Sequence, residues 1–237
     1  MNRSLVYLRV NRVDAAVCAQ AQQATVSDLH EAEFAAGRRG LMSSRMRPVV
    51  EGKRIAGPAV TAYCAPGDNL MMHRALYLAQ PGDVLVVVCE PATSGAQWGD
   101  MAARYALKKG LAGIVVQGCV RDTDMLRELG SPTWATHVLS SHPDKSGHGR
   151  INAPLVCDGV PVSPGDLIVA DGDGVICVPR EQAAQSVERA LARMRAEDAM
   201  AQEVAKGAAV WDLSGAAARY AEMDIEEIDA AFDDPRR

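Results

Sequence analysis

The chain has 237 residues, of which 48% are hydrophobic and 23% charged, and its formal net charge at pH 7 is −5. This composition is that of a globular protein long enough to bury a sizeable core, and it excludes an intrinsically disordered chain. Because the charges form no long run of one sign, the sequence has no basic patch for nucleic acid or an anionic membrane surface. A small-molecule or protein partner is therefore favoured.

Residues 1–54 are predicted to form an N-terminal helical part. The stretches 13–23 and 27–37 have helical composition, with Ser27 as an N-cap and Gly37 as a stop signal. We find neither the apolar run of a signal peptide near the N-terminus nor a membrane-spanning stretch elsewhere, so we expect a cytoplasmic protein.

Residues 55–178 are predicted to form an α/β core. Up to Pro132, strand-like and helix-like stretches alternate, which indicates parallel strands connected by helices. The expected strands are 55–65, 81–90 and 111–118, and the expected helices are 67–79, 99–110 and 122–130. After Pro132 short strands follow one another between Pro, Gly and Asp turns, which predicts an antiparallel second part of the core.

Several Asp-containing motifs in this core are predicted to be turns. Pro-Gly-Asp occurs at 66–68, 81–83 and 164–166, where Pro sets φ, Gly supplies a positive φ and Asp bonds nearby amides. The DGDG stretch at 171–174 lacks the twelve-residue frame of a calcium loop and connects two strand-like runs, so we expect a hairpin turn there.

Residues 179–237 are predicted to be C-terminal helices that serve in assembly. The long helix should cover about 179–206, and shorter helical pieces should follow near 208–223 and 224–232. Because no stretch has the composition of a linker, the whole chain is expected to form a single domain.

The cysteines, lysines and loop histidines provide no specific motif. The six cysteines form no CxxC pair and most lie in apolar, strand-like runs, which is typical of reduced core cysteines. The lysines have polar or glycine-rich neighbours, unlike the desolvated lysine of Schiff-base enzymes. His137, His142 and His148 lack the helical spacing of zinc motifs and are interpreted as loop residues. Gln117 and Cys119 have no assigned role.

Gly99-Asp100 opens a predicted helix directly after a loop. Asp100 can be interpreted as an N-cap, which stabilises a helix by about 1 kcal/mol and needs no function. Alternatively, the free N–H groups and positive dipole of this helix terminus bind an anion such as a substrate carboxylate.

Arg121-Asp122 follows the apolar run at 111–116 and the glycine at 118. Asp122 can also be an N-cap, with Arg121 as a solvated surface residue. However, open α/β sheets bind ligands at the carboxyl ends of their strands, and neighbouring parallel strands would bring Asp100, Arg121 and Asp122 into one crevice. Carboxylates beside a guanidinium suit a hard divalent cation together with an anionic oxygen substrate.

The spacing of Asp100 and Arg121-Asp122 resembles the signature of the 4-hydroxy-4-methyl-2-oxoglutarate / 4-carboxy-4-hydroxy-2-oxoadipate aldolases. These share the fold of the RraA regulators of ribonuclease E. The similarity extends over MRPVVEGKRIAGPAVTAYCAPGDNLMMH, GDMAARYALKKGLAGIVVQGCVRD and PGDLIVADGDGVICVP. The resemblance implies an RraA-like, swivelling-domain-like α/β fold, in which an α-β-β-α sandwich contains a mixed sheet and carries a C-terminal helical tail.

The resemblance also implies a Mg²⁺ or Mn²⁺ site. Asp122 would bind the metal directly, and Asp100 would bind it through water. Glu197, on the long C-terminal helix, would approach the metal through water from a neighbouring subunit, although its local sequence differs from that of the family. The site would then lie at a subunit interface of a homo-oligomer, a trimer or a hexamer.

By the same resemblance, the substrate's pyruvyl carboxylate would bind the backbone N–H groups of Gly99, Asp100, Met101 and Ala102. Arg121 would contact the C2 oxygen, which becomes the enolate oxygen during retro-aldol cleavage. His73 has mostly apolar neighbours typical of a structural histidine, but it matches a family histidine near the substrate. The family acts in aromatic-acid catabolism.

Three functions are consistent with this resemblance. The leading hypothesis is a metal-dependent pyruvate aldolase, and the alternative is a non-enzymatic, RraA-type protein that binds ribonuclease E. Because oxaloacetate forms the same enolate when it loses CO₂, we expect oxaloacetate decarboxylase side activity, and a dedicated decarboxylase remains a third possibility.

Overall fold

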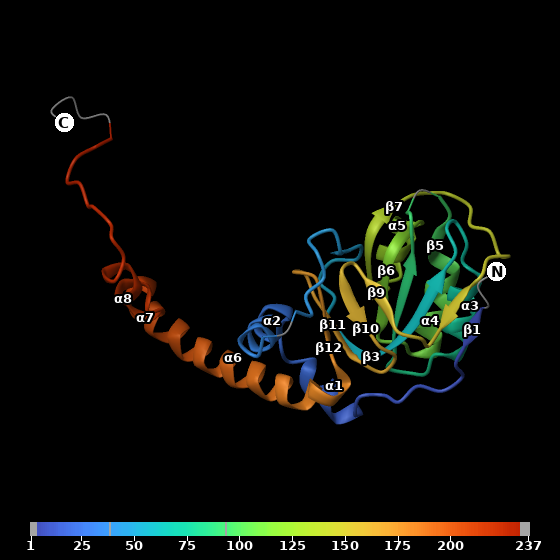
Figure 1. The fold of residues 1–237 in the computed structure, drawn as a ribbon, viewed down its shortest axis with the longest axis horizontal. Coiled ribbons are helices and arrows are strands. Elements are labelled where there is room, and N and C mark those ends of the chain that lie inside the picture. Colours follow the sequence, from blue (N-terminus) through green and yellow to red (C-terminus); the bar gives the residue numbers. More distant parts are fainter. Residues whose placement is uncertain (1–3, 38, 93, 233–237) are drawn as a thin grey trace. The chain divides into compact units, whose positions relative to one another are not determined.

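The computed structural model describes residues 4–37, 39–92 and 94–232 (Figure 1). The chain divides into two compact units, residues 1–192 and 193–237. A long helix, α6 (Ala183–Ala205), crosses the boundary between them. We describe each unit in turn.

The first unit contains the strands of the fold. Their bounds are β1 Leu5–Val6, β2 Arg47–Pro48, β3 Ile55–Cys64, β4 Val84–Cys89, β5 Ala96–Trp98, β6 Gly113–Val120, β7 Thr133–Val138, β8 Gly149–Ile151, β9 Leu155–Cys157, β10 Val160–Val162, β11 Leu167–Ala170 and β12 Val175–Val178. Its helices are α1 Ala15–Ala21, α2 Val26–Ala35, α3 Leu70–Leu78, α4 Asp100–Lys109 and α5 Thr123–Glu128, followed by a 3₁₀ turn at Arg180–Gln182 and the start of α6.

The main sheet is mixed. Its strand order is β1-β8-β3-β4-β6-β7-β2. Strands β3, β4, β6 and β7 are parallel and are connected by α3, α4 and α5, whereas β8 and β11 pair with β3 in antiparallel orientation. The carboxyl ends of the parallel strands therefore meet at one edge of the sheet, where α/β proteins place their ligands.

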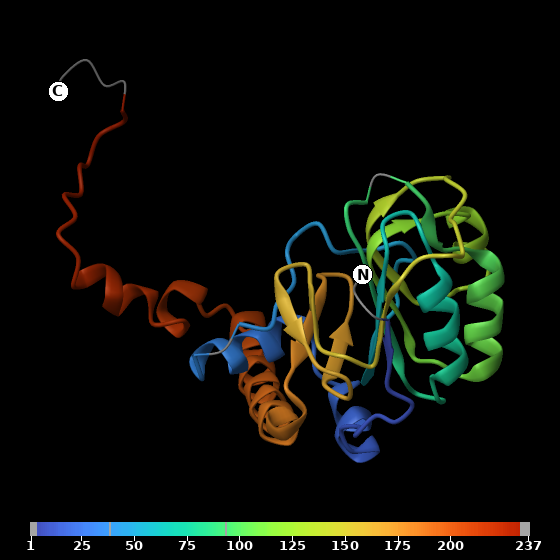
Figure 2. The same cartoon turned by 45° about the vertical axis from the view of Figure 1, so that its right-hand side comes forward.

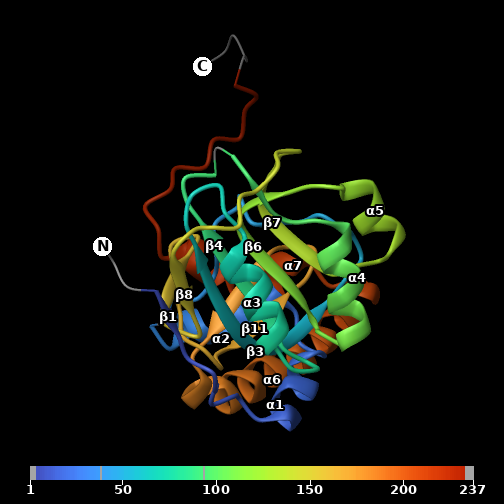
Figure 3. The ribbon, with the colours of Figure 1, turned by 90° about the vertical axis from the view of Figure 1, so that its right-hand side faces the viewer.

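The layers follow from the alternation of side chains along the strands. In β4, every second residue packs against α3, α4 and α5, and the others pack against the layer formed by β9–β12. Figure 2 shows the green helices on one side of the sheet and the orange strands on the other. The buried side chains facing the helices are Leu85, Val87 and Cys89, and those facing the other way are Val84, Val86 and Val88. Figure 3 shows α3 and α4 in front of the parallel strands. On the far side α2 packs against β12, which confirms the predicted layered α/β fold with a mixed sheet.

Three details of the predicted elements are wrong. Helix α2 is capped by Thr25, not Ser27, because Thr25 and Asp28 form a reciprocal capping box. Strand β7 continues the parallel set, since α5 returns the chain across the face of the sheet. Residues 224–232 are not helical, and their closely spaced acidic side chains disfavour a short helix that lacks packing partners.

The predicted turns and the core cysteines agree with the structure. Residues 171–174 connect the antiparallel strands β11 and β12, and the carboxylate of Asp171 accepts hydrogen bonds from the backbone N–H groups of Val26 and Asp173. The carboxylate of Asp166 similarly accepts from the N–H groups of Ser163 and Arg180. All six cysteines are free thiols, and every one except Cys18 is buried.

The second unit consists of the last part of α6, followed by α7 (Val210–Leu213) and α8 (Ala216–Ala221). The rings of Trp211 and Tyr220 meet edge to face, with centroids 5.2 Å apart, so α7 and α8 pack together. None of the helices in the described part of the chain combines the length and the apolar character needed to cross a membrane.

Candidate active site

The site begins where β5 passes into α4. Strand β5 runs parallel to β6, and Gly99 connects it to the first helical residue, Asp100. A Cβ atom on Gly99 would lie only 2.6 Å from Oδ2 of Asp122, so only glycine fits there without displacing that carboxylate. Glycine at this position therefore lets the start of α4 approach the end of β6.

Asp122 lies beyond the end of β6 in a left-handed backbone conformation, with φ 57° and ψ 38°. A non-glycine residue in this region is disfavoured by about 1 kcal/mol. Within the described structure its side chain does not cap α5; instead its Oδ2 accepts a hydrogen bond from the backbone N–H of Asp100 at 3.3 Å. Asp122 therefore occupies the N-cap position of α5, as the simple interpretation predicts, but its carboxylate contacts α4 and does not cap α5.

Charged side chains alternate in sign around this junction. Arg121 Nε lies 3.4 Å from Asp122 Oδ2, and Arg104 Nε lies 3.5 Å from Asp100 Oδ2. The backbone N–H of Arg121 donates to the carbonyl of Trp98 at 3.0 Å, which holds the end of β6 against β5. The structure thus brings together Asp100, Arg121 and Asp122, as the sequence predicts. Asp100 is itself the first residue of α4 and not its N-cap.

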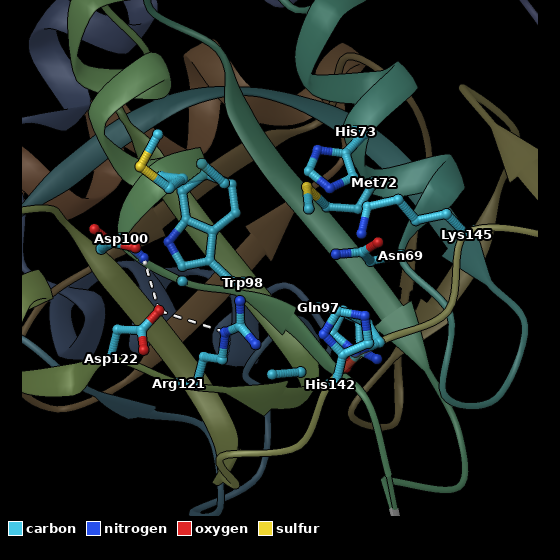
Figure 4. Close-up of a pocket in the computed structure, with 15 residues that line it drawn as sticks. Asn69, Met72, His73, Gln97, Trp98, Asp100, Arg121, Asp122, His142 and Lys145 are labelled. Atoms are coloured by element: carbon cyan, nitrogen blue, oxygen red, sulfur yellow. Dashed lines mark hydrogen bonds and ion pairs between the residues drawn. The ribbon is translucent and has the colours of Figure 1, made fainter.

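A cavity of about 200 Å³ opens at this junction (Figure 4). One side is formed by the Gly99–Ala102 segment together with Arg121 and Asp122. Figure 4 shows Asn69, His73, His142 and Lys145 on the opposite side, where Lys145 extends from its loop toward Asn69 and His73. The cavity thus places the start of α4 opposite a second group of polar side chains.

The start of α4 has the features of a carboxylate-binding site. The first intrahelical bond runs from Ala103 N–H to the carbonyl of Gly99, at 3.1 Å. The preceding N–H groups of Met101 and Ala102 point out of the helix N-terminus, where the helix dipole favours an anion. The Met101 side chain is exposed at the rim of the cavity.

His73 lies on α3 and lines the cavity. Its pKa is lowered below the ordinary 6.5, mainly by partial burial and further by the positive charge of Lys145, although Asp68 acts in the opposite direction. The neutral imidazole is therefore favoured near neutral pH, and a role in the site stays a prediction.

Several residues of the cavity wall are not identified by the sequence. The sequence predicts that His142 is a loop residue and excludes Lys145 as a Schiff-base lysine, without giving either a place in the site; the structure places both on the cavity wall. Asn69 and Trp98 also line the cavity, and neither belongs to a recognisable motif. Position is the available signal, because Asn69, the N-cap residue of α3, lies one helical turn before His73.

Gln117 and Cys119 lie near the site and have structural partners. The buried Gln117 amide accepts a hydrogen bond from the backbone N–H of Asp158 at 2.6 Å and donates to Glu90. The Cys119 N–H donates to Gln97 Oε1 at 2.9 Å, which connects the ends of β5 and β6. Both residues therefore support the strand ends and do not line the cavity described above.

The carboxylates suit a weakly chelated cation. Within the described chain, no three of the side chains that commonly bind metals come together around one point. Asp122 and Asp100 provide carboxylate oxygens at the cavity wall. Mg²⁺ usually binds through one or two carboxylates and keeps several waters, so this donor set fits Mg²⁺ or Mn²⁺ bound mainly through water.

Glu197 lies on α6 within the second unit, where its Oε1 is 3.0 Å from Nη2 of Arg193. Half of its side chain is exposed. Its predicted approach to the metal of a neighbouring subunit concerns an assembly of several chains and stays a prediction.

The sequence matches a known family over most of the core. A family model described as RraA-like, Aldolase/RraA, matches residues 23–177. A relative from Halalkalibacterium halodurans is 37% identical over 158 residues, which cover 67% of this chain and 75% of that protein. A relative from Burkholderia multivorans is 40% identical over 151 residues, which cover 63% of this chain and 90% of that protein. Both relatives have the provisional name 4-hydroxy-4-methyl-2-oxoglutarate aldolase.

Solved structures include a similar fold with a different described activity. RraAS2 from Streptomyces coelicolor superposes with a TM-score of 0.72 at 32% identity, covering 80% of this chain and 98% of that one. It is described as an unusual member of the RNase ES inhibitor RraA protein family. Similarity to this fold is therefore compatible with either an enzyme or an inhibitor of an RNA-processing enzyme.

Proposed function

The chain belongs to the RraA-like, Aldolase/RraA family, and we propose that it is a divalent-metal-dependent pyruvate aldolase. Its substrates would be 4-hydroxy-4-methyl-2-oxoglutarate, 4-carboxy-4-hydroxy-2-oxoadipate or both, cleaved to pyruvate plus a second pyruvate or oxaloacetate. The observation that carries the proposal is the position of the Asp122 carboxylate beside Asp100 and Arg121 at the cavity wall.

The charge distribution in the cavity supports a substrate with anionic groups at both ends. The N-terminus of α4 and Arg121 suit the pyruvyl carboxylate and the C2 oxygen. On the opposite wall, the ammonium of Lys145 suits a carboxylate at the distal end. Both proposed substrates have this arrangement, because each has a carboxylate on either side of the bond that breaks.

Cleavage requires a proton acceptor and a place for negative charge. The proton leaves the C4 hydroxyl, C4 becomes a ketone carbon, and the electrons of the C3–C4 bond form an enolate whose oxygen is attached to C2. Arg121 would stabilise that oxygen with its guanidinium. Asp100 would hold the water that accepts the proton, and His73, neutral near neutral pH, would donate or accept a hydrogen bond at the opposite wall.

Asp122 would hold Mg²⁺ or Mn²⁺ directly, with Asp100 acting through water. When bound, the cation supplies Lewis-acid stabilisation of developing negative charge and lowers the pKa of its water. Gly99 allows the carboxylate of Asp122 to lie against α4, so this proposal depends on a close contact between backbone and side chain.

The experiment is to measure pyruvate release from both hydroxy acids with Mg²⁺, with Mn²⁺ and with excess EDTA. We expect turnover that EDTA abolishes and that added metal restores. Oxaloacetate should be decarboxylated under the same conditions, since it gives the same enolate. Turnover of oxaloacetate alone would identify a dedicated decarboxylase.

The RraA-like alternative is favoured by the similarity to the Streptomyces coelicolor protein. Under this alternative the protein would bind ribonuclease E and would not need the paired carboxylates. Absence of turnover on all three substrates, together with binding to and inhibition of ribonuclease E, would replace the aldolase proposal.

A homo-oligomer, a trimer or hexamer, with Glu197 donated through water by a neighbouring subunit, is part of the same proposal. Its test is complementation between two inactive variants, Asp122→Asn and Glu197→Gln. If the site is shared, mixed oligomers contain some sites with both native residues, and activity returns on mixing. Full activity of a monomer in sedimentation-coupled assays would exclude a shared site. No nucleic acid or membrane is expected as a partner.

A further inference from the structure

Asp68 lies at the start of α3, next to the cavity, and is almost completely buried, with 2% of its surface exposed. Its Oδ1 accepts a hydrogen bond from the N–H of Leu70 at 2.7 Å. Its Oδ2 accepts from the N–H groups of Ser146 and Gly147, both at 2.7 Å. One carboxylate therefore connects the N-terminus of α3 to the loop between β7 and β8.

Backbone contacts support the same junction. Asn69 N–H donates to the carbonyl of Asp144 at 3.0 Å, and Asp144 N–H donates to the carbonyl of Gly67 at 2.9 Å. A Cβ atom on Gly147 would lie 2.7 Å from Cγ of Asp68, so the loop approaches the carboxylate as closely as glycine allows. Residues 144–147 are thus held directly against the chain that begins α3.

Helix α3 and the loop between β7 and β8 form the wall of the cavity that lies opposite the start of α4. The loop contributes His142 and Lys145, and α3 contributes His73 and, at its N-cap, Asn69. In the part of the chain that the structure describes, no carboxylate forms an ion pair with Lys145, whose ammonium extends toward Asn69 and His73 (Figure 4). The described lining of the cavity includes Asn69 and excludes Asp68, so Asp68 would act through its neighbours.

We infer that Asp68 is a positioning residue that sets specificity for substrates with a distal carboxylate, by holding the loop that presents Lys145. This inference rests on the proposed aldolase function and extends it to a residue outside the cavity. Lysine has many rotamers on a flexible stem, so a fixed loop backbone lowers the entropy lost when its ammonium binds an anion. Without the Asp68 carboxylate, the N–H groups of Ser146 and Gly147 would lose their acceptor and the loop would open to water.

The main test compares a reaction that uses the distal group with one that does not. In Asp68→Ala, KM for 4-hydroxy-4-methyl-2-oxoglutarate should rise about tenfold or more, as expected for loss of a charged hydrogen bond. Exchange of the pyruvate methyl protons in D₂O involves only the pyruvyl half of the substrate. Because this reaction does not use the distal carboxylate, its rate in Asp68→Ala should stay within about twofold of the wild-type rate. In a protein that already has Lys145→Met, Asp68→Ala should raise KM little further, because both substitutions act on the contact between Lys145 and the distal carboxylate.

Asp166→Ala is the matched control. Asp166 ends another Pro-Gly-Asp triplet, is also buried, and accepts backbone N–H bonds from Ser163 and Arg180 away from the cavity. It should lower thermal stability and leave KM unchanged. An equal fall of aldol cleavage and methyl exchange in Asp68→Ala would overturn the positioning role, as would additive effects of the Asp68 and Lys145 substitutions.

Two measurements test Asp68 independently of turnover. Amide hydrogen exchange at Ser146 and Gly147 should be slow in wild type and fast in the variant, and equal protection would refute the attachment of the loop. By calorimetry, the variant should lose affinity for 2-oxoglutarate, which has a distal carboxylate, and keep affinity for pyruvate.

If wild type shows neither turnover nor methyl exchange, the aldolase proposal fails while these measurements still decide the role of Asp68. If Asp68→Ala does not fold, Asp68→Asn tests the same point, because its amide group cannot replace both acceptor oxygens.

Discussion

The Oδ2 atom of Asp122 accepts a hydrogen bond from the backbone N–H of Asp100 at 3.3 Å, across the junction of two neighbouring strand–helix units. The carboxylate thus lies at the N-terminus of α4, although its own residue precedes α5. This relationship explains why Asp122 occupies a left-handed conformation: a normal N-cap geometry would direct the side chain to α5 and away from the cavity.

Replacing Asp122 by Asn should reduce aldol turnover by about hundredfold or more, because an amide is a poorer ligand for a hard cation. The fold should persist, since the side chain is partly exposed. The matched control is Asp124→Asn, two residues along, where the carboxylate is almost fully exposed and pairs with Arg127 at 2.9 Å. Turnover and metal binding should be measured for both variants; similar kcat/KM values in the two would argue against a ligand role for Asp122.

Gly99→Ala should impair the site more than the fold. The added methyl would lie 2.6 Å from Asp122 Oδ2 and 3.2 Å from Arg121 Cγ, so both side chains must move. We expect a fall in kcat of about tenfold to hundredfold, the range seen when a reacting group is misplaced by about 1 Å. Gly172→Ala is the control, because an added Cβ there meets no atom within 4 Å. Wild-type kcat in Gly99→Ala would show that the close approach is dispensable.

The pKa of His73 should respond to Lys145. Lys145→Met removes a positive charge that lowers this pKa, so the midpoint in an NMR titration of the imidazole should move upward. Lys53→Met, which removes a lysine next to Gly130, should leave the midpoint in place. A midpoint that does not move in Lys145→Met would place the ammonium away from His73.

The lowered pKa of His73 also predicts the sign of a pH effect on stability. Because the folded chain binds this proton less readily than the unfolded chain, the contribution of His73 to stability is complete above the ordinary pKa of 6.5. It is lost as pH falls through the lower folded pKa. In urea unfolding, the difference in free energy between wild type and His73→Gln should therefore change between pH 7 and pH 5; a constant difference would contradict the lowered pKa.

Arg12→Met should destabilise the protein without changing catalysis. Arg12 forms a two-pronged ion pair with Asp83, with both nitrogen–oxygen distances at 2.8 Å, and the Asp83 side chain is fully buried. The pair raises the pKa of Arg12, mainly through the hydrogen bond to Asp83. Loss of one partner leaves a buried carboxylate, which should lower the free energy of unfolding by about 3 kcal/mol. The exposed Arg9→Met is the control, and equal stability of the two variants would contradict the argument.

Much of the fold could be predicted from local patterns. The continuous apolar runs that became β4 and β6 are typical of strands buried on both faces, and Gly110 ends α4 in a left-handed conformation, as expected for a glycine at a helix C-terminus. The parallel pairing of β7 was missed because a six-residue helix is weak evidence for a crossover. The helix expected at 224–232 does not form, because helical composition alone stabilises a short helix too little when no other element packs against it.

Local sequence signals also predict one part of the candidate site, whereas the other part depends on the tertiary structure. The sequence by itself determined that Asp100 and Arg121-Asp122 stand at the starts of consecutive helices after parallel strands, because strand ends and glycines are local signals. Only the tertiary structure decided that Asp122 faces α4 and not its own helix, since that depends on the approach of Gly99 from another strand. It also decided that Lys145 forms the opposite wall. A loop between strands has no periodicity, so the position of such a lysine is set by distant partners such as Asp68 and not by its neighbours in the chain.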